Sequence, residues 1–177
     1  ARAGRTIFLK LTCFNGLFRV NSKGLFNVPF GRYRNPSIVN EANLRLASGL
    51  LARTTILSGD FLQSLPFIDE RTFVYLDPPY RPLNRTSRFT SYSHEGFTDA
   101  DQVRLADFFR QADHAGGRVM LSNSDPKNED PDDDFFDTLY QGYWIGRVPA
   151  KRMINSDSGK RGAINEILVM NYSPDDL

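Results

Sequence analysis

The sequence predicts an α/β fold built on a mixed β-sheet. Strand-like and helix-like segments alternate along its 177 residues, which is the pattern of a sheet covered by helices. The length suits about one domain, and 40% hydrophobic and 12% aromatic residues provide for a core. No uncharged apolar run approaches the roughly 18 residues of a membrane span, so no membrane association is expected.

The first forty residues predict the end of a helix followed by a β-hairpin. Residues 5–13 are apolar and basic, as at the end of a helix. The segments 18–20 and 26–28 flank a polar turn in which Gly24 can supply a positive φ.

Two longer helices are predicted from their caps and from apolar spacing. Asn40 can cap a helix that runs to about Ala52, with leucines at helical positions. Thr98 can cap a second helix that runs to about Ala112, and the glycine pair 116–117 ends it.

The other elements follow from β-branched, aromatic and apolar runs. We expect a short strand at 54–58, strands at 71–76 and 118–122, a short helix at 134–140, and closing strands at 144–148 and 166–172.

The tetrapeptide Asp77-Pro78-Pro79-Tyr80 directly follows the strand at 71–76. Ligands of α/β folds bind at this edge of the sheet. The two prolines stiffen the turn and lack N–H groups, so carbonyls can face a site. The Asp77 carboxylate and the Pro78 carbonyl can hold both hydrogens of a flat heteroaromatic amine, and Tyr80 can stack on its ring. Alternatively, the tetrapeptide is only a surface turn after a strand.

Charge is strongly segregated although the net charge is only +1. Residues 1–35 hold seven basic residues and no acid, residues 125–137 hold seven acids against Lys127, and residues 147–161 are basic again. Separate basic segments favour a nucleic-acid partner, although a solvated basic surface is the alternative. Because Cys13 is the single cysteine and only two histidines are present, no metal site of Cys and His is predicted.

Residues 77–80 match the catalytic motif of amino-group DNA methyltransferases, and the chain resembles Dam-type adenine methylases from about residue 5 to 172. Further matching segments, in the order of that family, are 12–21, 26–33, 89–92, 121–125 and 152–156. The resemblance implies a Rossmann-like methyltransferase core with a helical and hairpin DNA-recognition segment. It further implies methyl transfer from S-adenosylmethionine to the exocyclic amine of a flipped adenine in double-stranded DNA.

The resemblance also implies a role for particular residues. Asp77, Pro78, Pro79 and Tyr80 would be catalytic, with Asp77 also near the cofactor. Asp60 and Phe61 would lie at the adenosine half of S-adenosylmethionine; alternatively, Phe61 is a core residue after an ordinary strand-end turn.

For DNA, the resemblance places three residues at base pairs: Asn15, Leu17 and Arg19, the last suited to guanine. Phe14 would wedge into the opened base stack. A second recognition cluster would consist of Pro29 and Arg32, and the expected target is GATC.

Alternatives remain for several of these residues. Phe14 and Leu17 can instead be core residues, and Arg32 can instead be a phosphate contact. Lys151 and Arg152, with Lys160 and Arg161, would clamp the DNA backbone or lie in a solvated loop. The acidic segment 125–137 would face away from DNA.

One feature departs from the family pattern: its glycine-rich cofactor turn and a preceding lysine-bearing segment are absent. We therefore expect residues 1–40 to be a target-recognition segment and 41–177 the C-terminal part of a catalytic domain. This chain alone would then bind S-adenosylmethionine poorly and be inactive.

Other functions remain as alternatives. The chain can be a catalytically silent DNA-binding fragment of such an enzyme, or it can methylate an amine in RNA or protein. A cytoplasmic protein of prokaryotic or phage type is expected. The sequence leaves open whether it works alone or beside a restriction endonuclease that it does not contact.

Overall fold

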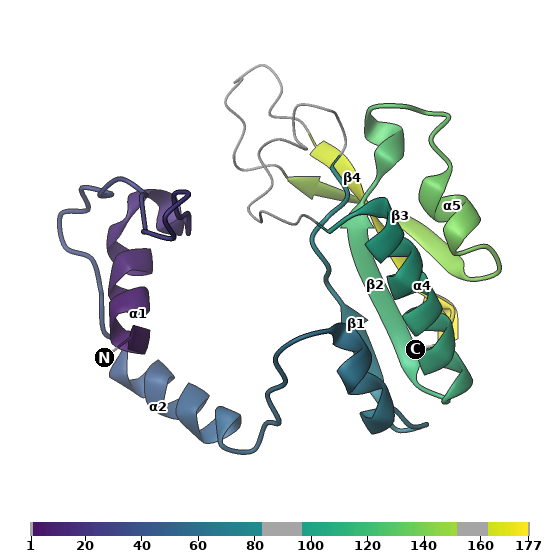
Figure 1. Cartoon of the computed structure of the whole chain (residues 1–177), viewed down its shortest axis with the longest axis horizontal. Coiled ribbons are helices and arrows are strands. Elements are labelled where there is room, and N and C mark those ends of the chain that lie inside the picture. The colour runs from purple at the N-terminus through teal and green to yellow at the C-terminus, as the bar shows by residue number, and fades with distance from the viewer. Residues whose placement is uncertain (1, 83–96, 152–162, 177) are drawn as a thin grey trace. The chain divides into compact units, whose positions relative to one another are not determined.

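The computed structural model describes residues 2–82, 97–151 and 163–176, and these form two compact units, 1–57 and 58–177. Each unit is described by itself (Figure 1). Within the described residues, no helix is long and apolar enough to span a membrane.

The first unit consists of two helices and a hairpin. Helix α1 spans Arg2–Thr12, a single 3-10 turn (η1) spans Phe14–Gly16, and α2 spans Glu41–Leu51. Asn40 caps α2 as predicted, because its side chain accepts the Asn43 N–H at 3.0 Å.

The predicted hairpin is present as a turn with one β-bridge. Val20 and Phe26 form the bridge, and Gly24 N–H donates to the Asn21 carbonyl at 2.9 Å. Gly24 adopts a φ of 73°, the positive value that the sequence predicted. A tilted ring contact between Phe18 and Phe26 closes the hairpin at 5.9 Å between centroids.

The prediction of a strand at 54–58 is wrong. These residues are exposed coil, and none of them pairs with another strand among the described residues. A β-branched run becomes a strand only where a neighbour completes its hydrogen bonds and its packing. The adjoining 3-10 helix η2 spans Phe61–Phe67, with Asp60 as its N-cap.

The second unit holds a mixed sheet in the order β1-β2-β4-β3. β1 (Phe73–Leu76) and β2 (Arg118–Ser124) are parallel, whereas β4 (Ala163–Met170) is antiparallel to both β2 and β3 (Trp144–Lys151). The mixed α/β sheet confirms the prediction of fold class at that level. The four strands were predicted near these bounds.

Helix α4 (Asp99–His114) connects β1 with β2 and lies against β2 (Figure 1). Thr98 caps it in a capping box with Asp101. The buried core consists of apolar residues from α4, β2, β4 and the short helix α5 (Phe135–Leu139) with the residue after it. They are Leu105, Ala106, Phe108, Phe109, Ala112, Val119, Leu121, Phe136, Tyr140, Ile167 and Val169.

Alternation along β2 determines what surrounds the end of β1. Val119 and Leu121 are in the core, and Asn123, the next residue on the same face, contacts Gln102 of α4. Ser122 points to the opposite face, where it contacts Tyr75 of β1. Because β1 and β2 are parallel, their carboxyl ends meet at one edge of the sheet.

Candidate active site at the carboxyl end of β1

The loop that leaves β1 contains the predicted catalytic residues 77–80. Ser122 of β2 contacts both Tyr75 and Asp77. Its Oγ is 2.9 Å from the Tyr75 hydroxyl, and it donates to Asp77 Oδ1 over a long 3.4 Å. The Asp77 side chain remains exposed. A carboxylate held at the sheet edge is therefore accessible to a ligand.

Tyr80 is tied to the beginning of the ladder between β2 and β4. Its hydroxyl donates to Glu166 Oε2 at 3.3 Å, and Glu166 pairs with Ser124 in the sheet. Burial raises the pKa of Tyr80, and the carboxylates of Glu166 and Asp77 raise it further. The phenol is thus neutral at physiological pH, and Tyr80 as a residue is 37% exposed, so a ligand can reach it.

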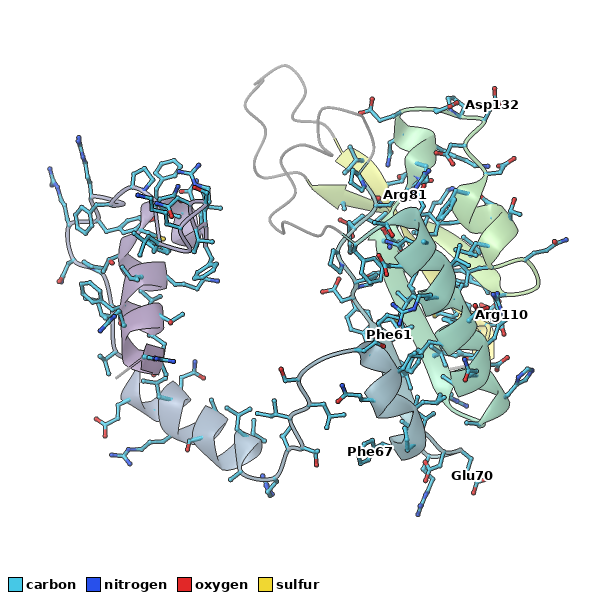
Figure 2. The ribbon with its side chains drawn as sticks, viewed as in Figure 1. Phe61, Phe67, Glu70, Arg81, Arg110 and Asp132 are labelled. Carbon is cyan, nitrogen blue, oxygen red and sulfur yellow. The ribbon has the colours of Figure 1, made fainter. Side chains whose placement is uncertain are left out.

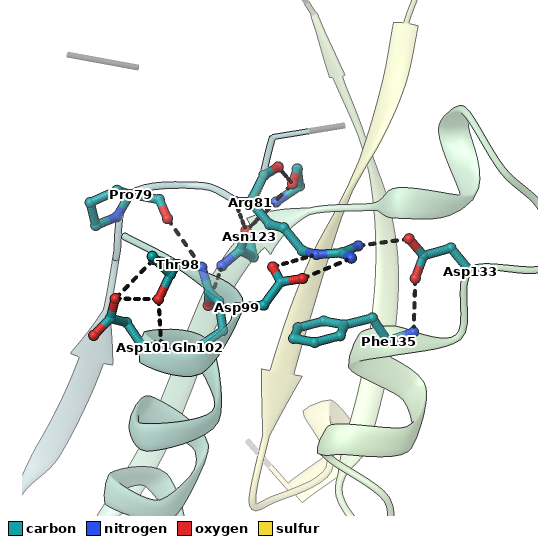
Figure 3. Close-up of polar contacts among 10 residues, drawn as sticks. Pro79, Arg81, Thr98, Asp99, Asp101, Gln102, Asn123, Asp133 and Phe135 are labelled. Carbon is teal, nitrogen blue, oxygen red and sulfur yellow. Dashed lines mark hydrogen bonds and ion pairs between the residues drawn. The ribbon is translucent and has the colours of Figure 1, made fainter. Parts of the chain in front are cut away.

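The backbone of the loop is hydrogen-bonded to α4 and to β2. The Pro79 carbonyl accepts from Gln102 Nε2 at 3.2 Å, and the Arg81 carbonyl accepts from Ser124 Oγ at 2.6 Å (Figure 3). By contrast, no group among the described residues donates to the Pro78 carbonyl. The carbonyl that the sequence singled out as an acceptor is thus free of a donor from the described residues.

Arg81 anchors the far end of the loop. Its guanidinium pairs with Asp99 at 2.9 Å and with Asp133 at 2.7 Å, and it lies 4.3 Å over the Phe135 ring (Figure 3). Burial disfavours the Arg81 cation, but its hydrogen bonds with the two carboxylates raise its pKa overall. These contacts attach the loop to the N-terminus of α4 and to the segment before α5.

The predicted cofactor residues lie beside the same helix. Asp60 pairs with Arg104 of α4 at 2.7 Å, and this hydrogen bond lowers the pKa of Asp60. Phe61 is half-buried and meets Phe108 edge-on at 5.6 Å. Because Gln102 contacts the loop and Arg104 contacts Asp60, α4 links both predicted sites. Figure 2 labels Phe61 of the predicted cofactor site and Arg81 of the loop. Phe61 packs on the core, as the alternative had it, and its role toward a cofactor stays a prediction.

The predicted DNA residues of the first unit gather where α1 ends. Phe14, 52% exposed, donates its N–H to the Pro29 carbonyl at 2.8 Å. Asn15 and Arg32 have positive φ values of 52° and 53°, and are the only non-glycine residues described that do. Such backbone is uncommon outside glycine and clusters at functional sites.

Arg19 extends along the hairpin and contacts Asn27. Its Nε and Nη2 donate to Asn27 Oδ1 and to the Asn27 carbonyl at 2.9 and 3.0 Å. Leu17 is half-buried, and its carbonyl accepts from the Cys13 thiol at 3.1 Å. The DNA roles of these residues stay predictions.

Part of the predicted phosphate clamp cannot be placed. Arg152, Lys160 and Arg161 lie outside the described residues, as does the segment 89–92, and only the backbone of Lys151 is described. Arg147, at the start of the same basic block, is turned toward acids: it pairs with Asp125 at 3.1 Å and with Asp137 at 2.8 Å.

Two residues of this site, Gln102 and Glu166, were not predicted from the sequence. A signal for Gln102 was present, because 102, 105, 106 and 109 fall on one helical face and the last three are apolar. A polar residue on an apolar face requires a buried partner. Glu166 stood within a predicted strand and gave no comparable signal.

The fold places this loop at the edge where α/β proteins bind their ligands, and comparison with known proteins identifies the family. Residues 1–154 match the family described as D12 class N6 adenine-specific DNA methyltransferase. The chain therefore belongs to this family.

Several curated relatives agree. Type II methyltransferase M.MjaIII of Methanocaldococcus jannaschii is 52% identical over 97% of this chain and 57% of its own length. Type II methyltransferase M1.LlaDCHI of Lactococcus lactis subsp. cremoris is 47% identical over 97% and 58%. The DNA adenine methylase of Escherichia coli K12 is 32% identical over 98% and 59%. The chain thus spans less than three fifths of the length of these relatives.

Proposed function

We propose that this protein transfers a methyl group from S-adenosylmethionine to the exocyclic amine of an adenine flipped out of double-stranded DNA. The observation that carries the proposal is the loop after β1. It combines the exposed Asp77 carboxylate, the Pro78 carbonyl with no donor among the described residues, and the exposed residue Tyr80. Family membership supplies the reaction class.

The two acceptors can activate an otherwise poor nucleophile. An adenine amine is conjugated with its ring, so its lone pair is delocalised. If Asp77 and the Pro78 carbonyl each accept one amine hydrogen, the nitrogen becomes pyramidal and its lone pair can attack. The nearby carboxylate also stabilises the positive charge that develops on nitrogen. Tyr80 would hold the base by stacking, with its hydroxyl fixed on Glu166.

The residues at the proposed cofactor site suit the chemistry of S-adenosylmethionine. Asp60 is exposed and carries a carboxylate, and Phe61 is a half-buried residue whose ring would pack on an adenine. The cofactor supplies an electrophilic methyl group on a sulfonium. The thioether that leaves is neutral, so its departure needs no acid. Asp77 would lie where donor and acceptor meet. A Rossmann-like core follows from the same assignment, with β1 and β2 as its parallel strands.

We further propose that residues 1–40 read the DNA sequence and that GATC is the target. The exposed Phe14, the extended Arg19 and the positive-φ residues Asn15 and Arg32 support this assignment. The alternative of a catalytically silent fragment is not favoured, because the relatives compared are named as methyltransferases or methylases.

The test is transfer of labelled methyl from S-adenosylmethionine to DNA duplexes with and without GATC, and to RNA. The 177-residue chain and a longer form of the protein are each compared with their own Asp77→Ala variant. We expect transfer to GATC duplexes only, by a longer form that carries a glycine-rich cofactor turn and not by the 177-residue chain alone. Asp77→Ala should abolish this transfer while DNA binding is largely kept. Retained transfer by Asp77→Ala would remove Asp77 from the mechanism, and equal transfer to RNA would contradict the substrate class.

A further inference from the structure

Two buried amides connect the backbone on the two sides of Tyr80. Gln102 and Asn123 both have a relative exposure of 0%. Gln102 Nε2 donates to the Pro79 carbonyl at 3.2 Å. Asn123 Nδ2 donates to Gln102 Oε1 at 3.2 Å, while Asn123 Oδ1 accepts the Arg81 N–H at 2.9 Å (Figure 3). The loop is thus held at the residue before Tyr80 and at the residue after it.

The two ends of this chain of hydrogen bonds fix its direction. The Arg81 N–H can only donate, and the Pro79 carbonyl can only accept. Asn123 must therefore present its oxygen to Arg81 and its nitrogen to Gln102. Gln102 must in turn present its oxygen to Asn123 and its nitrogen to Pro79. Each position needs a donor and an acceptor at once, which a side-chain amide supplies and an ionised carboxylate does not.

We propose that Gln102 and Asn123 are positioning residues for methyl transfer. By fixing the backbone from Pro79 to Arg81, this amide clamp aims the Tyr80 ring and turns the Pro78 carbonyl toward the target amine. The clamp itself touches neither adenine nor cofactor. Its catalytic meaning rests on the proposed function, whereas its effect on the loop can be measured without any turnover.

The first test compares Gln102→Met with Gln111→Met. Both variants replace a glutamine of α4, but Gln111 is exposed and donates only to the Asp107 carbonyl of its own helix. We expect Gln102→Met to lower kcat about 10- to 100-fold, because small displacements of reacting groups are costly. The KM values for DNA and S-adenosylmethionine should change less than about threefold, and Gln111→Met should behave as wild type.

Amide hydrogen exchange gives a readout that does not depend on activity. Because 78, 79 and 82 are prolines, residues 77–82 have amide hydrogens only at Asp77, Tyr80 and Arg81. Gln102→Met should accelerate exchange at Arg81 at least about tenfold while exchange in β2 around Val119 stays slow. Unchanged exchange at Arg81 would overturn the proposal, whatever happens to kcat.

Gln102→Glu is the second variant and also serves if Gln102→Met does not fold. A protonated carboxyl can donate to Pro79 and accept from Asn123, but an ionised one cannot donate. Burial raises the pKa of a carboxyl introduced there. Activity relative to wild type, and protection of Arg81, should therefore recover as the pH falls from about 9 to about 6.

The outcomes separate the two proposals. If the activity of Gln102→Glu relative to wild type does not change with pH, the amide clamp is overturned. If wild type transfers no methyl group while Arg81 loses protection in Gln102→Met, the clamp stands and the proposed function fails. If Asp77→Ala is inactive while Gln102→Met matches Gln111→Met in kcat and exchange, only the clamp fails.

Discussion

Arg19 is held by Asn27 on the other side of the hairpin turn. Both contacts use Nε and Nη2, so the Nη1 donors have no partner among the described residues. A guanidinium fixed at one edge loses less freedom when its remaining donors meet a guanine. Such preorganisation suits the reading of a base better than a long, freely rotating side chain would.

Arg19→Ala should therefore reduce sequence discrimination. We expect a loss of about 1–3 kcal/mol of discrimination at one base pair of the target. The measurement is binding to GATC duplexes and to each single-base variant at fixed salt. Lys23→Ala, in the exposed turn of the same hairpin, is the control for charge alone. An equal loss on every duplex would identify Arg19 as a phosphate contact.

The acidic segment 125–137, which ends within α5, uses several of its charges inside the fold. Its acids are predicted to lie on a face turned away from DNA, and that orientation stays a prediction. Several of these acids are nevertheless partners of cations: Asp133 pairs with Arg81, and Asp125 and Asp137 pair with Arg147. Acid-to-base pairs thus fasten the loop after β1, α5 and β3 together.

These pairs predict a loss of stability in acid. Burial alone would raise the pKa of Asp137, but Arg147 and Lys127 lower it below its usual value. A carboxyl whose pKa is lower in the folded state makes the unfolded state bind more protons as the pH falls. Its stabilisation is present above the unfolded pKa and is lost as the pH falls through the folded value.

We therefore expect the free energy of unfolding to fall between about pH 5 and pH 3. Asp137→Asn should reduce this fall, since one of the titrating carboxyls is gone. Asp132→Asn is the matched control, because Asp132 is exposed and makes no ion pair among the described residues. Urea denaturation at several pH values is the measurement. Identical pH dependence in Asp137→Asn and Asp132→Asn would contradict the prediction.

Caps, turns and apolar spacing allowed most elements to be predicted. Asn40, Thr98 and Gly24 each act locally, so their roles can be read from the sequence alone. The segment 54–58 failed because a strand depends on a partner that local sequence does not reveal. The sequence also pointed to the loop 77–80, but the residues that hold it come from α4, β2 and β4, and only the fold brings these together.

Across the whole molecule, burial is distributed unequally between the two units. The core residues of the second unit come from α4, α5, β2 and β4, together with Tyr140 after α5. Among the described residues of the first unit, only Thr12 and Cys13 are buried. Helix α2 has no buried residue, and its Leu46 is 69% exposed. On β1, Phe73 and Tyr75 are 57% and 54% exposed. Apolar burial is the main source of stability, so the two units should differ in local stability.

Amide hydrogen exchange on the 177-residue chain can measure this difference directly. We expect amides in β2 and β4, such as Leu121 and Ile167, to open only with global unfolding. Amides in α2 should exchange at least about 100-fold faster, because an isolated 11-residue helix is only marginally stable. Association between chains could also protect α2, so exchange is compared at two protein concentrations. Equal protection of α2 and β2 at both concentrations would contradict the prediction, because it would mean that the α2 leucines are covered within a single chain.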